Sequence, residues 1–244
     1  MDFQLTVNGF DFRASYPDET VKNVLLPLLR KLTDMHKAQK RRIIALLAAP
    51  PGTGKSTLAA VLEELSRRDE SLVPVQALGM DGFHRHQDYL LSHTVLKDGE
   101  EIPMAKIKGM PETFDADKLR RTLLAAREGK VLWPVYDRRI HDVVEDAMEA
   151  DAPILIVEGN WLLLDKPEWR GLPCDMSIFV GAEESQLRER LIMRKMRGGL
   201  TREEAEAFYA RTDGPNVRLC MAESRPADLR LALGEDGALV PENH

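Results

Sequence analysis

The sequence predicts a three-layer α/β/α fold around a mostly parallel sheet, and three observations support this prediction. Short apolar runs without polar interruption are typical of strands buried on both faces, as at 43–48, 154–157 and 176–180. Segments with helical patterns alternate with such runs, at 55–67, 115–127 and 183–197. The first apolar run leads into a loop of glycine and proline that opens a helix. Alternating strands and helices form a parallel sheet covered on both faces.

The front of the chain is expected to be an addition to this core. Residues 3–16 alternate loosely and contain Asn8-Gly9, a pair that favours a tight β-hairpin turn. Residues 19–36 then have apolar side chains at helical spacing. We therefore expect one domain over 1–244, in which 1–40 is an N-terminal hairpin and helix.

The middle and end of the chain complete the expected elements. Further strands are predicted at 73–78, 131–135 and 229–233, and 87–109 is expected to be polar and irregular. Thr201 precedes Glu204 by three residues, a capping-box pattern that starts a helix.

Composition restricts the class of protein. The 244 residues are 43% hydrophobic and 30% charged, with a formal net charge of −6 and a pI of about 5.6. An acidic balance argues against a general nucleic-acid binder. Cys174 and Cys220 stand far apart and outside any metal-type cluster, so we expect free thiols. No signal peptide and no apolar run of 18 residues is seen, so we expect a cytoplasmic location and no membrane partner.

The glycine-rich loop matches the P-loop pattern, apart from Ala49 in place of the usual first glycine. Backbone N–H groups of such a loop point at phosphate oxygens, and its lysine and serine serve the β and γ phosphates and magnesium. The predicted cofactors are therefore ATP and Mg²⁺. The residues expected to bind the nucleotide are Pro51, Gly52, Thr53, Gly54, Lys55, Ser56 and Thr57.

Two acidic residues follow predicted strands. Asp81 comes after the strand at 73–78, and Glu158 ends the run at 154–157. Ligands bind beyond the carboxyl ends of strands in open α/β sheets, so both carboxylates are expected at the site. Asp81 suits a base that takes the proton of an attacking hydroxyl, and Glu158 suits a magnesium ligand. The alternatives are a turn cap for Asp81 and a salt bridge for Glu158.

A basic helix face is expected over 183–197. Arg190, Arg194 and Arg197 are spaced four and three residues apart, so they share one face. This face could close over ATP and stabilise charge on the transferred phosphoryl group. A solvated charged face is the alternative.

The order of these motifs resembles one kinase group. Segments 49–57, 80–84, 108–115, 134–138 and 157–160 are similar to those of the phosphoribulokinase, uridine kinase and pantothenate kinase group. Nearly the whole chain, including 209–216, resembles the bacterial YggC-like branch, which is related to proteins labelled fructose transport system kinases. The resemblance implies the P-loop NTPase fold with a five-stranded parallel core and a helical lid at about 183–215.

The resemblance also implies residue roles. Lys55 would contact the γ-phosphate, Ser56, Glu158 and Asp81 would surround magnesium, and Asp81 would be the base. Arg190 and Arg194 would stabilise the transition state. The resemblance places Tyr136, Asp137, Arg138 and His141 where uridine kinases contact their acceptor. His84, Lys108 and Asn216 are further candidate acceptor contacts.

The expected activity is transfer of the γ-phosphate of ATP to a hydroxyl of a small metabolite. Gly109 stands where uridine kinases carry an aspartate for the ribose hydroxyls, and Lys108 and Arg138 add positive charge. These features favour a sugar, a sugar acid or a pantothenate-like acceptor. A uridine-type nucleoside kinase, a nucleoside-monophosphate kinase, a P-loop ATPase or GTPase switch and a nucleotide-binding regulatory protein are the alternatives. The oligomeric state stays open, with a homodimer as one option.

Overall fold

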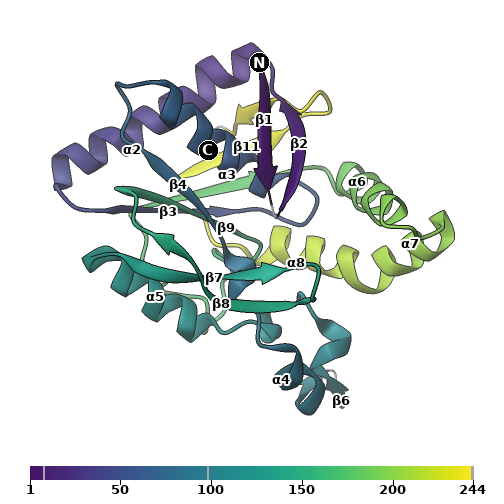
Figure 1. Cartoon of the computed structure of the whole chain (residues 1–244). Coiled ribbons are helices and arrows are strands. Elements are labelled where there is room, and N and C mark those ends of the chain that lie inside the picture. The colour runs from purple at the N-terminus through teal and green to yellow at the C-terminus, as the bar shows by residue number, and fades with distance from the viewer. Residues whose placement is uncertain (8, 98, 243–244) are drawn as a thin grey trace.

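The computed structural model describes residues 1–7, 9–97 and 99–242, and a six-stranded sheet lies at its centre (Figure 1). The strand order is β12-β11-β10-β3-β9-β4. These strands are β3 (Ile43–Ala48), β4 (Val75–Gly79), β9 (Ile154–Gly159), β10 (Met176–Gly181), β11 (Leu229–Leu233) and β12 (Leu239–Pro241). Neighbours from β11 to β4 are parallel, and β12 pairs antiparallel with β11. The predicted parallel core is confirmed, with an added edge strand that the sequence analysis missed.

Helices cover both faces of the sheet, as predicted. All six side chains of β3 are fully buried, and they alternate between two hydrophobic cores. One core contains α2 (Leu26–Gln39) and α3 (Lys55–Arg68), and the other contains α5 (Ala116–Glu128). Because β3 has no solvent-facing side, its sequence is a continuous apolar run rather than an alternating one.

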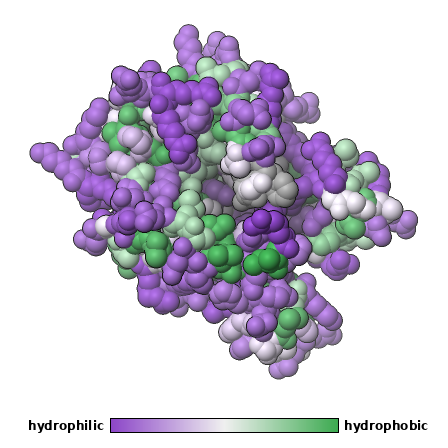
Figure 2. Space-filling view, viewed as in Figure 1, coloured by the Kyte–Doolittle hydropathy of each residue, from purple (hydrophilic) through white to green (hydrophobic). Residues whose placement is uncertain are grey.

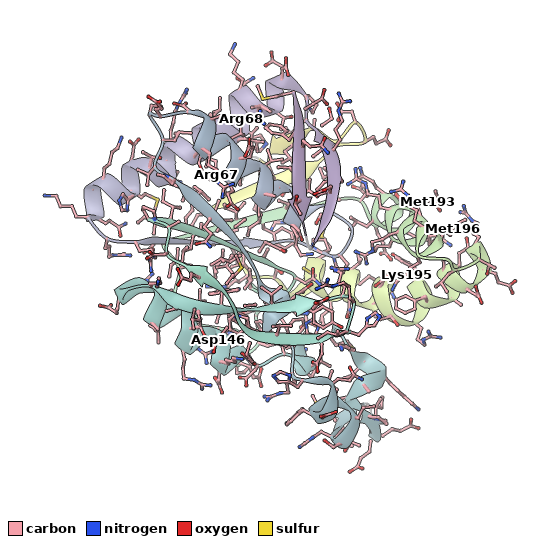
Figure 3. All side chains as sticks on the ribbon, viewed as in Figure 1. Arg67, Arg68, Asp146, Met193, Lys195 and Met196 are labelled. Atoms are coloured by element: carbon pink, nitrogen blue, oxygen red, sulfur yellow. The ribbon has the colours of Figure 1, made fainter. Side chains whose placement is uncertain are left out.

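The N-terminal hairpin packs against α3. Its strands β1 (Asp2–Val7) and β2 (Phe10–Ser15) pair antiparallel, as predicted, whereas Asn8 of the predicted turn lies outside the described residues. Phe3 and Leu5 are buried, and the guanidinium of Arg68 on α3 lies 5.2 Å from the Phe3 ring (Figure 3). The hairpin leads into α1 (Asp18–Thr20) and a π-helical turn, η1 (Val21–Leu25), which continues into α2.

Two further hairpins lie outside the central sheet. β7 (Val131–Asp137) pairs with β8 (Asp142–Ala150), so the strand predicted at 131–135 exists but belongs to its own two-stranded sheet. The expectation that 87–109 is irregular was wrong, because this segment holds α4 (Gln87–Ser92), β5 (Thr94–Lys97), β6 (Glu100–Pro103) and the 3-10 turn η3 (Met104–Ile107). These elements are short and mostly exposed, so they lack the apolar periodicity that signals longer elements. Two more 3-10 turns are η2 (Met80–Phe83) and η4 (Pro111–Thr113).

The helices after β10 form a group at one side of the molecule (Figure 1). They are α6 (Glu184–Arg197), α7 (Arg202–Phe208), the π-helical turn η5 (Tyr209–Asp213) and α8 (Gly214–Glu223). α6, α7, η5 and α8 share a small apolar cluster of their own. The predicted capping box is present at the start of α7, where Thr201 and Glu204 bond each other's backbone N–H. Among the residues described, no helix is long and apolar enough to span a membrane.

Asp175, just before β10, joins three parts of the core. Its carboxylate accepts hydrogen bonds from Arg41 at 2.7 and 3.1 Å, from Arg127 at 3.0 Å and from the Ile44 amide of β3 at 2.9 Å. Only 5% of the side chain is exposed. Burial alone would raise the pKa of Asp175, but the hydrogen bonds from Arg41 and Ile44 and the charge of Arg127 hold it below its ordinary value.

We predict that Asp175→Asn lowers the free energy of unfolding by about 2 kcal/mol at pH 7, because charge-assisted hydrogen bonds are lost. A carboxyl with a depressed pKa stabilises the fold above its unfolded pKa, and this contribution is lost as the pH falls through the folded pKa. The difference in the free energy of unfolding between Asp175→Asn and wild type should therefore become smaller below about pH 4. Urea denaturation measures it, with Asp165→Asn as control, since Asp165 forms an exposed pair with Arg170. Equal effects of both substitutions would contradict the anchoring role.

Candidate active site

The P-loop forms one wall of a pocket of about 590 Å³. It follows β3 and ends where α3 begins at Lys55, so the amino end of a 14-residue helix faces the pocket. A Cβ atom on Gly52 would lie only 3.0 Å from the Leu191 side chain, so α6 packs tightly on this loop. Exposed N–H groups at a helix start attract anions, which makes this wall suitable for phosphate.

Some of the predicted P-loop residues line the pocket, and others stabilise the loop behind it. Gly52, Gly54, Lys55, Ser56 and Thr57 line the pocket. Thr53 is buried and donates its hydroxyl to the Pro50 carbonyl at 2.8 Å, which stabilises the turn. Pro51 and Thr53 are not among the lining residues.

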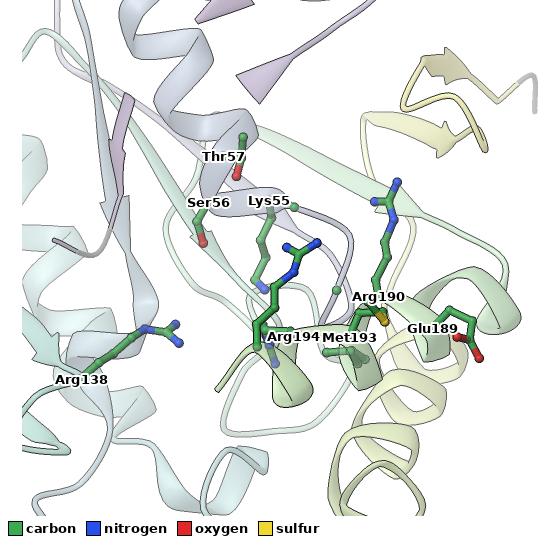
Figure 4. A pocket seen from close by; sticks show the side chains of 12 residues that line it. Lys55, Ser56, Thr57, Arg138, Glu189, Arg190, Met193 and Arg194 are labelled. Carbon is green, nitrogen blue, oxygen red and sulfur yellow. The ribbon is translucent and has the colours of Figure 1, made fainter. Parts of the chain in front are cut away.

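The basic face of α6 forms the opposite wall. Arg190, Arg194 and Arg197 all line the pocket, so they share one face of the helix as predicted. Figure 4 shows Arg190 and Arg194 projecting from α6. Arg194 is about half-exposed, and its guanidinium lies 4.0 Å from Asp213. The arginines therefore face the P-loop while they remain partly solvated.

The acidic residues lie at the ends of adjacent strands. Gly79 at the end of β4 pairs with Glu158 of β9, and η2 places Asp81 just beyond. The Ser56 hydroxyl donates to Glu158 Oε1 at 2.8 Å. Burial raises the pKa of Glu158; the charge of Lys55 opposes this rise and that of Asp81 adds to it. The three side chains from α3, η2 and β9 converge as the motifs predicted.

A second pocket, of about 650 Å³, meets the first one. Ser56 and Arg138 line both pockets, and Asp81, Glu158, Tyr136 and Asp137 line the second. The guanidinium of Arg138 lies 3.7 Å from the Asp81 carboxylate, and both side chains are nearly half-exposed. Figure 2 shows this face hollowed between the β1–β2 and β7–β8 hairpins. The molecule thus offers two compartments joined at a serine and an arginine.

Four of the expected acceptor contacts line neither pocket. His84 packs between the rings of Phe114 and Tyr136, and burial lowers its pKa. Lys108 donates to Gln87 Oε1 at 2.7 Å and to the His141 carbonyl at 2.8 Å. Lys108 therefore holds the turn of the β7–β8 hairpin that carries His141.

Asn216, the fourth, lies on α8 beside Gly109. It is buried, and its Oδ1 atom has no hydrogen-bond partner within the described part of the chain. A Cβ on Gly109 would lie 3.8 Å from Asn216 Nδ2, but Gly109 has φ +98°, a conformation that strains other residues. The Gly109 carbonyl also accepts the Trp161 indole N–H at 3.0 Å. The loop is therefore fixed in a conformation that excludes an unstrained aspartate.

The donor set suits magnesium better than a metal bound by protein alone. Within the described residues, no group of three or more His, Cys, Asp or Glu side chains could hold a metal ion. Magnesium is usually bound by one or two carboxylates together with substrate phosphates and waters. Ser56, Glu158 and Asp81 meet this requirement at the junction of the two pockets.

Sequence reasoning missed part of the second pocket. Thr6 and Gly9 of the N-terminal hairpin line it, as do Ala59, Ala60 and Glu63 of α3. The α3 residues follow Ser56 at helical spacing, so a common face with Ser56 could have been inferred. No sequence signal connects the hairpin with this pocket, because only the tertiary packing brings them together.

A phosphate loop between a buried strand and a helix, faced by arginines and joined to an acidic second pocket, defines a P-loop phosphotransferase. Residues 43–214 match the model of the Phosphoribulokinase / Uridine kinase family, and the chain belongs to this family.

Individual relatives agree with this assignment. The chain is 48% identical over 240 residues to the uncharacterized protein YggC of Escherichia coli strain K12, covering 97% of this chain and 98% of that protein. It is 36% identical over 194 residues to a putative uridine kinase of Schizosaccharomyces pombe, covering 76% and 79% of the two chains. Among solved structures, a putative fructose transport system kinase from Silicibacter sp. TM1040 is similar, with a TM-score of 0.75 and 31% identity, covering 85% and 98%. The expected kinase group and fold are confirmed.

We predict that Gly82→Ala displaces the β7–β8 hairpin and destabilises the fold by about 1–3 kcal/mol, the usual cost of overpacking. A Cβ at Gly82 would lie 1.9 Å from the Pro134 carbonyl oxygen, and this is backbone that cannot rotate away. Thermal or urea unfolding measures the change. Gly129→Ala is the matched control, because its Cβ would meet nothing within 4 Å. If the two variants have the same stability, the close approach of Gly82 to the Pro134 backbone does not limit the side chain at this position.

Proposed function

We propose that this protein transfers the γ-phosphate of ATP to a hydroxyl group of a small metabolite that is not a nucleoside. One observation carries the proposal: a phosphate-binding pocket and a second pocket with a half-exposed carboxylate meet at Ser56 and Arg138. ATP would occupy the first pocket and the acceptor the second. The γ-phosphate would then lie where the pockets join.

The first pocket is suited to hold ATP and to receive developing charge. The P-loop N–H groups and Lys55 would bind the β and γ phosphates, and Arg190 and Arg194 would neutralise charge from the other wall. Ser56 and Glu158, with Asp81 near, would hold Mg²⁺, which when bound would supply positive charge to the phosphate groups. The helices within residues 183–215 would act as a lid, since α6 packs on the P-loop through Leu191.

Asp81 would serve as the base. Its carboxylate accepts the proton of the acceptor hydroxyl as the hydroxyl oxygen bonds to the γ phosphorus. The bond from that phosphorus to the bridging oxygen breaks, and its electron pair leaves with ADP. The products are ADP, a phosphate monoester and one proton. Arg138 beside Asp81 would keep the carboxylate in place and counter negative charge at the junction.

We infer the acceptor class from the loop at Gly109, although Gly109 itself lines neither pocket. The φ of +98° at this position disfavours the aspartate with which a uridine-type site would bind ribose hydroxyls. A site without that partner discriminates poorly in favour of ribose. We therefore favour a sugar, a sugar acid or a pantothenate-like alcohol. The similarity to a putative uridine kinase makes a nucleoside the second candidate.

We predict that Asp81→Asn lowers the transfer rate by ~10²–10⁴ while ATP affinity stays within a few-fold, because the amide cannot take the proton. Single-turnover kinetics and calorimetric ATP titration give the two quantities. Asp117→Asn changes an exposed carboxylate outside both pockets and should act like wild type. If the Asp81 variant turns over within a few-fold of wild type, Asp81 is not the base.

The acceptor class is tested by a screen with ATP and magnesium, scored by product mass and ADP release. We expect a phosphate monoester from at least one sugar, sugar acid or pantothenate-like alcohol and poor use of uridine and cytidine. Efficient phosphorylation of uridine or cytidine, with poor use of the others, would favour the nucleoside alternative. ADP release that does not depend on any acceptor would favour a P-loop ATPase.

A further inference from the structure

The second pocket extends beyond the residues to which a role has been given. From Ser56 and Asp81 it continues between α3 and the β7–β8 hairpin, and Thr6 and Gly9 of the N-terminal hairpin also line it. We call the part lined by Thr6, Gly9, Ala59, Ala60, Ala77, Val144, Ala147 and Met148 the distal compartment. These residues come from four separate elements, so the compartment exists only in the folded chain.

Small and apolar side chains shape the distal compartment. Ala59 and Ala60 on α3 line the same space as Ala147 and Met148 on β8. Alanine at these positions leaves volume that a larger side chain would fill. Figure 2 shows hydrophobic residues gathered along the lower margin of the hollow.

Two charged residues that line the same pocket next to the distal compartment, Glu63 and Arg139, are already paired. The Glu63 carboxylate accepts the Ala77 backbone N–H at 3.0 Å and pairs with Arg67. Arg139, further along, pairs with Asp137 at 2.7 Å. A ligand rich in hydroxyl groups would lose water here without gaining equivalent partners, which is unfavourable. Apolar ligand surface loses nothing and gains burial.

The N-terminal hairpin forms one wall of the pocket, is anchored by buried side chains and lies outside the region that the family model matches. Phe3 and Leu5 are buried, whereas Thr6 on the opposite strand face lines the pocket. The family model matches only residues 43–214, so the hairpin lies outside it. The hairpin therefore adds a wall to the pocket that the matched region does not itself supply.

We propose that the distal compartment binds the non-reacting body of the acceptor beside the N-terminal hairpin, and that it favours an alcohol with an apolar body over the sugars and sugar acids considered above. This inference rests on the kinase function proposed above. The hydroxyl lies at Asp81, and the hydrocarbon part extends between α3 and β8 towards Thr6.

The test uses 1,2-alkanediols from propanediol to octanediol as probes, because they share one hydroxylated end and differ only in apolar length. Dissociation constants are measured by NMR titration with an ATP analogue bound. Each added methylene should tighten binding by up to about fourfold until the compartment is full. Thr6→Trp and Ala60→Leu should fill the compartment and weaken octanediol binding by about tenfold or more, with propanediol within about twofold of wild type.

The matched control is Gln4→Trp, which places the same side chain on the same exposed strand face, two residues from Thr6 and outside the pocket. It should retain the wild-type dependence on chain length. Thermal unfolding checks that each variant is folded, and Ala147→Leu replaces either variant that is not. A flat series in wild type, or the same series in all variants, would overturn the proposal.

The outcome separates this inference from the kinase function. For an acceptor found in the screen, Thr6→Trp should raise KM about tenfold and leave kcat within about twofold. Turnover with an unchanged KM in both variants would contradict the proposed role of the distal compartment but support the kinase function. Binding that depends on chain length, without phosphate transfer to any acceptor, would support the distal compartment as a binding site but contradict the kinase function.

Discussion

The burial of β3 on both faces fixes where chemistry can take place. A strand without a solvent-facing side must sit inside the sheet, and the loop that leaves its carboxyl end emerges at the edge where ligands bind. β9 and β4 follow β3 in the sheet. Glu158 is the last residue but one of β9, and Asp81 comes two residues after the end of β4. The P-loop and the carboxylates of Glu158 and Asp81 thus come from three neighbouring strand ends. Their convergence is a property of strand order rather than of their separation along the chain.

The elements that could be predicted from the sequence are those whose burial leaves a recognisable apolar pattern or a helix cap. β3, β9 and β10 are apolar because both faces are covered, and α3, α5 and α6 have recognisable patterns or caps. β8 could not be predicted, since five of its nine residues are exposed and four are acidic. The pair β5–β6 and the three-residue β12 are too short to establish a pattern. What escaped prediction is therefore what the core does not constrain.

The candidate site divides in the same way. Residues in local motifs, such as Lys55 and Asp81, could be placed from the sequence because a loop of fixed geometry carries them. The sequence showed that Lys108 is charged but could not show that Gln87 and the His141 carbonyl engage it. Contacts such as Thr6 with the second pocket depend on how the N-terminal hairpin packs on α3, and no local pattern records that packing.

The left-handed backbone at Gly109 limits which side chains this position can accept. Its carbonyl is bonded to Trp161 and its amide donates to Thr113 at 3.1 Å, so the loop is held at both sides. An exchange of Gly109 for aspartate alone would strain the backbone before the new carboxylate could reach a ligand. On the proposed acceptor assignment, a change towards a nucleoside acceptor would therefore need the loop path to change before the side chain. A graft of the whole segment, rather than a point substitution, is the route that protein engineering would have to take.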